Sequence, residues 1–178
     1  MANTKWIIDP THSEIQFKIR HLMITNVTGF FGKFKAEIEG GGDQDFSSSK
    51  ISFTADVDSI STNNEQRDGH LKSSDFFDIA KNPTLTFVST KLEKISDEEY
   101  TLFGNLTMHG VTKPVKLNVE HGGVITDPWG KTRTGFTIEG KINRKEFGLE
   151  WNSPTETGGF VLGEEVKLHA NAEFVKQV

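Results

Sequence analysis

The sequence contains no cysteine and a single tyrosine among its 178 residues. Without cysteine the chain can form no disulfide, no thiolate metal site and no cysteine nucleophile. No apolar stretch approaches the roughly 20 residues of a membrane-spanning helix, so stable membrane insertion is not expected. Twenty Lys and Arg residues face 25 Asp and Glu residues, without any basic run. Nucleic acid is therefore not an expected partner, because phosphate contacts need clustered positive charge.

Motifs of common catalytic and cofactor sites are also missing. The sequence has no GxSxG elbow, no phosphate loop ending in Gly-Lys-Ser/Thr and no GxGxxG that opens a helix. None of its six histidines forms a close HxH, HxxxH or HExxH pair. We therefore expect no enzyme activity, no cofactor and no resident metal. Residues 1–10 hold no apolar segment of signal-peptide length, which predicts a cytoplasmic protein, or a secreted one if a leader has been removed.

Apolar and polar residues alternate with a period of two along most of the chain, as is typical of half-buried antiparallel strands. Eight segments show this alternation: 14–20, 33–39, 51–58, 84–87, 101–108, 115–119, 136–142 and 166–174. Between the third and fourth segments, residues 63–71 do not alternate and begin with the N-cap candidates Asn63 and Asn64, which predicts a short helix. The length and the lack of a linker predict one domain over residues 1–178.

Eight strands with one apolar face can close into an all-β antiparallel barrel or pack as a sandwich with a filled core. Long alternating runs favour a tall barrel, and small residues on the apolar faces favour a lumen that holds a ligand. These small residues are Ala36, Ala55, Gly104, Gly140, Ala170 and Ala172. The residues predicted to line the lumen are Phe17, Ile19, Phe34, Ile38, Phe53, Val57, Leu85, Phe87, Leu106, Met108, Leu117, Phe136, Ile138, Leu168 and Phe174.

The non-alternating region also contains the polar cluster Arg67-Asp68-Gly69-His70. Asp68 and His70 could act as an acid/base pair, and Arg67 could bind a phosphate group. In the structural alternative, Arg67 and Asp68 tie the helical turn to neighbouring loops. The same choice applies to Arg144, which lies at the end of a predicted strand. Arg67, His70 and Arg144 are therefore candidates for binding a ligand head group at a mouth of the barrel.

Four sets of residues along the chain form a recognisable series. They are Trp6–Asp9 with His12, Ser13, Phe17 and His21; Arg67–Asp78 with Pro83 and Phe87; Gly104–Val115; and Ile142–Arg144 with Phe147 and Gly148. In this order they resemble the YceI-like family over nearly the whole chain. Polar residues shared with that family are His12, Arg67, Asp68, His70, Asp75 and Arg144.

The resemblance implies an eight-stranded, lipocalin-like antiparallel barrel with a short helical insertion between strands three and four. Family members bind polyisoprenoids or other long amphiphiles inside the barrel, and several form dimers, so a homodimer is an expected assembly. The favoured hypothesis is a non-enzymatic protein that sequesters a long-chain isoprenoid or fatty amphiphile for transport, storage or a stress response. Two alternatives stay open: an enzyme that acts on such a chain through Asp68 and His70, and a structural module with a filled core.

Overall fold

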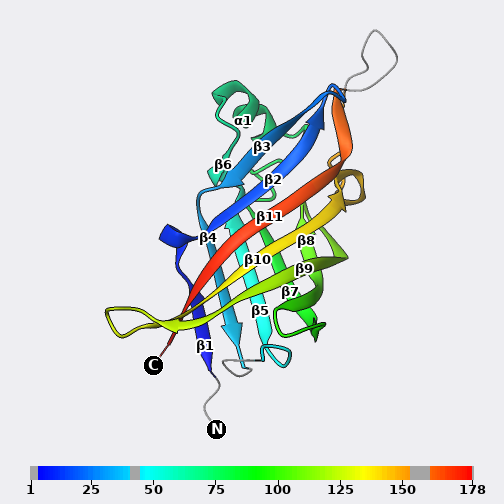
Figure 1. The fold of residues 1–178 in the computed structure, drawn as a ribbon. Helices are drawn as coiled ribbons and strands as arrows, with labels where there is room; N and C mark the ends of the chain where they lie inside the picture. Colours follow the sequence, from blue (N-terminus) through cyan, green and yellow to red (C-terminus); the bar gives the residue numbers. More distant parts are fainter. Residues whose placement is uncertain (1–3, 41–44, 153–160, 178) are drawn as a thin grey trace.

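The computed structural model describes residues 4–40, 45–152 and 161–177. Within these residues the chain forms long strands, one α-helix and three short 3-10 helices (Figure 1). The strands are β1 (Lys5–Ile8), β2 (Glu14–His21), β3 (Thr25–Phe31), β4 (Phe34–Glu39), β5 (Lys50–Asp56), β6 (Ile60–Ser61), β7 (Thr84–Lys94), β8 (Glu99–Met108), β9 (Val111–Thr126), β10 (Thr132–Asn143) and β11 (Leu162–Lys176). The helices are η1 (Pro10–His12), η2 (Val57–Ser59), α1 (Glu65–Lys72) and η3 (Arg144–Phe147). None of the helices in the described part of the chain is long and apolar enough to cross a membrane.

Eight of the strands close into a ring. Hydrogen-bonded neighbours run in the order β1-β4-β5-β7-β8-β9-β10-β11, and β11 pairs back with β1. Every pair in this ring is antiparallel. Closure gives each strand of the ring a neighbour on both sides, which removes the exposed edges that an open sheet of these eight strands would have. The predicted eight-stranded antiparallel barrel is confirmed.

The membership of the ring differs from the sequence pattern in one respect. β11 is 15 residues long and pairs along one edge with two strands. Its residues 162–171 pair with β2, and its residues 174–176 pair with β1. The alternating segment 14–20 is part of β2, which leaves the ring with β3 and β6 as a branch at the upper end of the barrel (Figure 1). β1 completes the ring instead. Its four residues are too few for alternation to be recognised.

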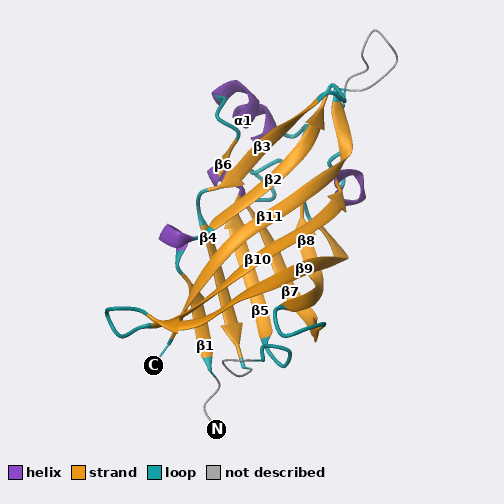
Figure 2. Ribbon diagram, in the orientation of Figure 1, coloured by secondary structure: helices purple, strands orange, loops and turns teal. Residues whose placement is uncertain are grey.

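The predicted helix between the third and fourth alternating segments is present as α1. Asn64 is its N-cap, and the side-chain oxygen of Asn64 accepts a hydrogen bond from the Arg67 backbone N–H at 3.0 Å. At the other end, the Ser73 hydroxyl donates to the His70 carbonyl at 2.6 Å. Figure 2 shows α1 at the upper end of the barrel, outside the strands. The helix is therefore placed to bound that end of the interior.

The lower end of the barrel is filled by an aromatic cluster. Phe46, on the connection from β4 to β5, is 1% exposed, and its ring lies 5.8, 5.1 and 5.3 Å from those of Trp6, His121 and Phe136. The Phe46 backbone N–H also donates to the Tyr100 hydroxyl at 3.3 Å. The cluster consists of Trp6, Phe46, Tyr100, His121, Phe136 and Phe174. It makes this end of the barrel solid, so any space for a ligand lies above it.

Candidate functional site

A cavity of about 590 Å³ occupies the barrel between the aromatic cluster and α1. It extends from Phe174, whose ring lies 5.9 Å from Phe136 of the cluster, to His70 on α1. Most residues around it are apolar, and several of its polar ones come from the segment 62–70. A concave apolar site with a few polar groups at one end is the usual form of a site for a small amphiphilic molecule.

Eleven of the fifteen residues predicted to face the lumen line this cavity. They are Phe17, Ile19, Phe53, Leu85, Phe87, Leu106, Met108, Leu117, Ile138, Leu168 and Phe174. Alternation identifies them because it determines which face of a strand points inward. Whether any of them touches a ligand stays a prediction.

The other four do not line the cavity. Ile38 pairs with Trp6, and Phe136 packs on Phe46, so both lie at the level of the aromatic cluster. Val57 is in η2, where its backbone N–H donates to the Pro83 carbonyl, and Phe34 packs on Phe53 at a ring distance of 6.4 Å. Alternation does not report the height of a residue along the barrel axis, which is why Ile38 and Phe136 were included. It also does not show that β5 ends at Asp56, just before Val57.

Two of the small residues have a different role from the one expected. A Cβ atom on Gly104 would lie 2.3 Å from Phe87 Cζ, and one on Gly140 would lie 2.3 Å from Leu117 Cδ2. These glycines make room for the large side chains of neighbouring strands, and so they help to fill the wall. Ala36, Ala170 and Ala172 do line the cavity. Ala55 is buried and does not line the cavity, so of the small residues only these three alanines border the open volume.

The upper end of the cavity is bounded by aromatic residues outside the strands. Trp151 lies 4.7 Å from the His70 ring and 5.3 Å from the Phe76 ring, and all three line the cavity. Sequence reasoning missed Phe76 and Trp151 because neither belongs to an alternating segment. The pair Phe76-Phe77, two adjacent phenylalanines within a polar stretch, was the available signal.

The structure does not bring Asp68 and His70 together as an acid/base pair. The Asp68 carboxylate accepts hydrogen bonds from the Thr62 backbone N–H at 2.8 Å and from the Thr62 hydroxyl at 2.6 Å. His70 Nε2 lies 2.8 Å from an oxygen of Asp75 instead. Arg67 Nε donates to the Thr62 hydroxyl at 2.7 Å, and its Nη2 donates to the Thr62 carbonyl at 2.6 Å. Arg67 and Asp68 thus tie α1 to the end of β6, as in the structural alternative.

Arg144 is the most buried of the three head-group candidates, at 2% exposed, and it also lines the cavity. Its Nε donates to the Gly163 carbonyl at 2.8 Å, and its Nη1 donates to the carbonyls of Leu149 and, at 2.9 Å, Trp151. These bonds join η3 to β11 and hold the segment that carries Trp151 over the cavity. Desolvation by burial lowers the pKa of Arg144, but a guanidinium keeps its charge at neutral pH.

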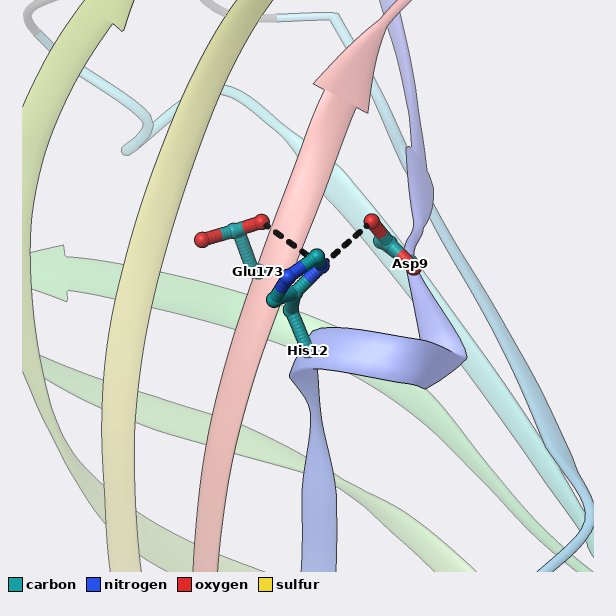
Figure 3. A group of neighbouring side chains, drawn as sticks. All are labelled: Asp9, His12 and Glu173. Carbon is teal, nitrogen blue, oxygen red and sulfur yellow. Dashed lines mark hydrogen bonds and ion pairs between the residues drawn. The ribbon is translucent and has the colours of Figure 1, made fainter.

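A second polar cluster, Asp9, His12 and Glu173, lies away from the cavity lining (Figure 3). His12 Nδ1 is 3.0 Å from Asp9 and 3.7 Å from Glu173, a set of side chains that could hold a metal ion. Arg133 Nη1, however, donates to the same two carboxylate oxygens at 2.9 and 2.8 Å. A metal ion would have to displace the guanidinium from both carboxylates, so the arrangement is best described as an ion-pair network.

Hydrogen bonds of this network lower the pKa values of two carboxyl groups. Hydrogen bonds from Thr11, His12 and Arg133 hold the pKa of Asp9 well below its usual range. Arg133 Nε donates to Asp127 at 2.7 Å, which, together with backbone N–H donors, lowers the pKa of that carboxyl too. Lowered carboxyl pKa values stabilise the folded state above the unfolded pKa of about 3.9, and this stabilisation is lost as the pH falls below it.

Replacing Arg133 by methionine is expected to lower the melting temperature at pH 7. Asp9, Asp127 and Glu173 then keep their negative charges without the shared cation. The deficit relative to the natural protein should shrink as the pH falls through about 4, because protonation removes the uncompensated charges. Thermal unfolding followed by circular dichroism across this pH range measures it. Lys131→Met is the matched control, and a deficit that stays constant with pH would contradict the assignment.

The comparisons with known proteins agree with the fold. The family model described as "YceI-like domain" matches residues 6–174. A UPF0312 protein of Staphylococcus epidermidis is 42% identical over 172 residues, which are 96% of this chain and 97% of the relative.

Solved structures extend this agreement to three dimensions. The Campylobacter jejuni YCEI protein is 36% identical, with a TM-score of 0.76 over 90% of this chain and 91% of that chain. A polyisoprenoid binding domain from Saccharophagus degradans has a TM-score of 0.67 over 97% of this chain and 98% of that chain, and at 15% identity it shows a shared fold. The family match and the identity to the relatives confirm the resemblance in sequence, and the chain belongs to the YceI-like family.

Proposed function

We propose that the protein binds a long-chain apolar or amphiphilic lipid, foremost a polyisoprenoid, inside the barrel. The observation that carries this proposal is the cavity of about 590 Å³, lined mainly by apolar side chains and closed below by the aromatic cluster. The polyisoprenoid binding domain from Saccharophagus degradans, which shares the fold, supports an isoprenoid as the ligand. Carriage or storage of the lipid, a cytoplasmic location and homodimer formation stay predictions from the sequence.

The energetics support binding of a chain without many polar contacts. Burial contributes about 0.8 kcal/mol per methylene group, so about ten carbons contribute about 8 kcal/mol before the cost of ordering the chain. That corresponds to roughly micromolar affinity, and longer chains bind more tightly until the cavity is filled. The cavity therefore selects for length and apolarity of the tail.

Organic extraction of the purified protein followed by mass spectrometry tests the proposal. We expect a co-purifying long-chain molecule, or uptake of added farnesol (a C15 isoprenoid alcohol) by the emptied protein. Empty extracts together with no farnesol binding would contradict the proposal and would favour a structural module.

Extraction followed by mass spectrometry also tests the alternative of an enzyme. The observation in favour of this alternative is the His70–Asp75 pair, whose histidine lines the cavity. Farnesyl diphosphate incubated with the protein is expected to be recovered unchanged. A product that disappears with the His70→Ala variant, in a protein that remains folded, would replace binding by enzymatic turnover.

A further inference from the structure

The guanidinium of Arg144 is only partly used by the protein. Its Nε and Nη1 donate to backbone carbonyls, whereas Nη2 is buried and has no hydrogen-bond partner among the described residues. Arg144 is 2% exposed and lines the cavity. A buried donor group without a partner is unfavourable and uncommon in proteins, so this nitrogen is available to something that enters the cavity.

Among the residues that the structure describes, no carboxylate forms an ion pair with the Arg144 guanidinium. The acidic group whose charge influences the guanidinium is Glu164. Its carboxylate is exposed and forms an ion pair with Lys145 at 3.0 Å. The direct partners of the guanidinium are neutral carbonyls of Leu149, Trp151 and Gly163. Removing a cation from water without a counter-ion is costly, and an anion that comes with the ligand would offset this cost.

The two other head-group candidates are placed less well for this role. Arg67 is exposed, so water would compete with a ligand there, and two of its three guanidinium nitrogens already donate to Thr62. His70 Nε2 already faces the Asp75 carboxylate, whose negative charge disfavours an anion nearby. Of the three residues, Arg144 alone is fully buried at the cavity wall with a free donor.

We propose that Arg144 binds the anionic head, a phosphate or a carboxylate, of the amphiphile in the cavity. This inference rests on the proposed function and specifies its ligand class and orientation. Arg144 bonds to the Trp151 carbonyl, and the Trp151 ring contacts His70 on α1, which places the head at the upper end. The tail then runs toward Phe174 and the aromatic cluster.

The test uses three probes with the same C15 isoprenoid tail: farnesyl monophosphate, farnesoic acid and farnesol. Affinities are measured by titrating the full chain with each probe and recording the heat or the tryptophan emission, to which Trp151 in the cavity lining contributes. We expect at least one anionic probe to bind about tenfold or more tightly than farnesol, since hydrogen bonds to charged groups are among the strong ones. The phosphate and carboxylate arms show which head is preferred.

The variant Arg144→Gln should lose this preference, so that its affinities for the anionic probes and for farnesol agree within about twofold. Lys145→Gln, which removes one positive charge from the exposed neighbouring residue, is the matched control and should keep the preference. If Arg144→Gln fails to fold, the natural chain still decides: equal affinities for all three probes would overturn the role of Arg144 and leave lipid binding intact. Binding of none of them would overturn the proposed function itself.

Discussion

Replacing Ala170 by tryptophan is expected to weaken farnesol binding by about fiftyfold. Ala170 lines the cavity, and its neighbours in register, Ile15 and Ile138, line it as well. An indole ring at this position occupies space that otherwise holds at least three methylene groups of the ligand. At about 0.8 kcal/mol each, the loss is about 2.4 kcal/mol, which corresponds to that factor. Titration of the variant with farnesol measures the change.

The control for this variant is Asn171→Trp. Asn171 follows Ala170 on β11, is exposed, and faces the opposite side of the strand, so a tryptophan there adds the same bulk outside the cavity. Farnesol should bind this control as it binds the natural protein. Unchanged affinity in a folded Ala170→Trp variant would show that the ligand lies elsewhere and would refute the barrel as the binding site.

Replacing Phe46 by alanine is expected to lower the free energy of unfolding by about 3–5 kcal/mol. Phe46 is 1% exposed, and its ring contacts those of Trp6, His121 and Phe136. Phe46 comes from a loop and packs against residues of three different strands. These strands are held in place by their hydrogen bonds in the barrel, so they cannot easily move into the cavity that the lost phenyl group leaves. Equilibrium unfolding in urea, with the same slope for both proteins, measures the loss.

Phe30→Ala makes the same substitution on β3 at a side chain that is 39% exposed. Its effect should remain within about 1 kcal/mol, because no closed cavity is created. Equal losses for the two variants would mean that the Phe46 ring is not tightly packed in the aromatic cluster, and the lower end of the barrel would then not be solid.

The strands could be predicted from the sequence because alternation is a local property. In β8, for example, Leu102, Leu106 and Met108 point inward by the pleat alone. The helix was predictable for the same reason, since Asn64 caps it within three residues. β1 was not predictable in this way. Its place in the ring depends on pairing with β4 and β11, which are distant in the sequence.

The chemistry of the site was predictable only in part. Arg67, Asp68, His70 and Arg144 were recognised as polar residues in unusual surroundings, but their partners could not be read from spacing. Asp68 binds Thr62, and His70 binds Asp75, although Asp68 is nearer to His70 in the sequence. A side chain's direction on a helical turn decides its partner, and a separation of two residues places side chains on different faces.

The sequence by itself determined the fold class, the single helical insertion and the family, because the pleat of a strand and the cap of a helix involve only neighbouring residues. The tertiary structure decided which parts of the barrel are solid and which are open. Phe46 closes one end from a loop, and the carbonyls around Arg144 lie five to nineteen residues away in the chain. The burial of Arg144 and its unpartnered Nη2 among the described residues arise only when such distant segments meet, and these two properties give Arg144 its proposed role.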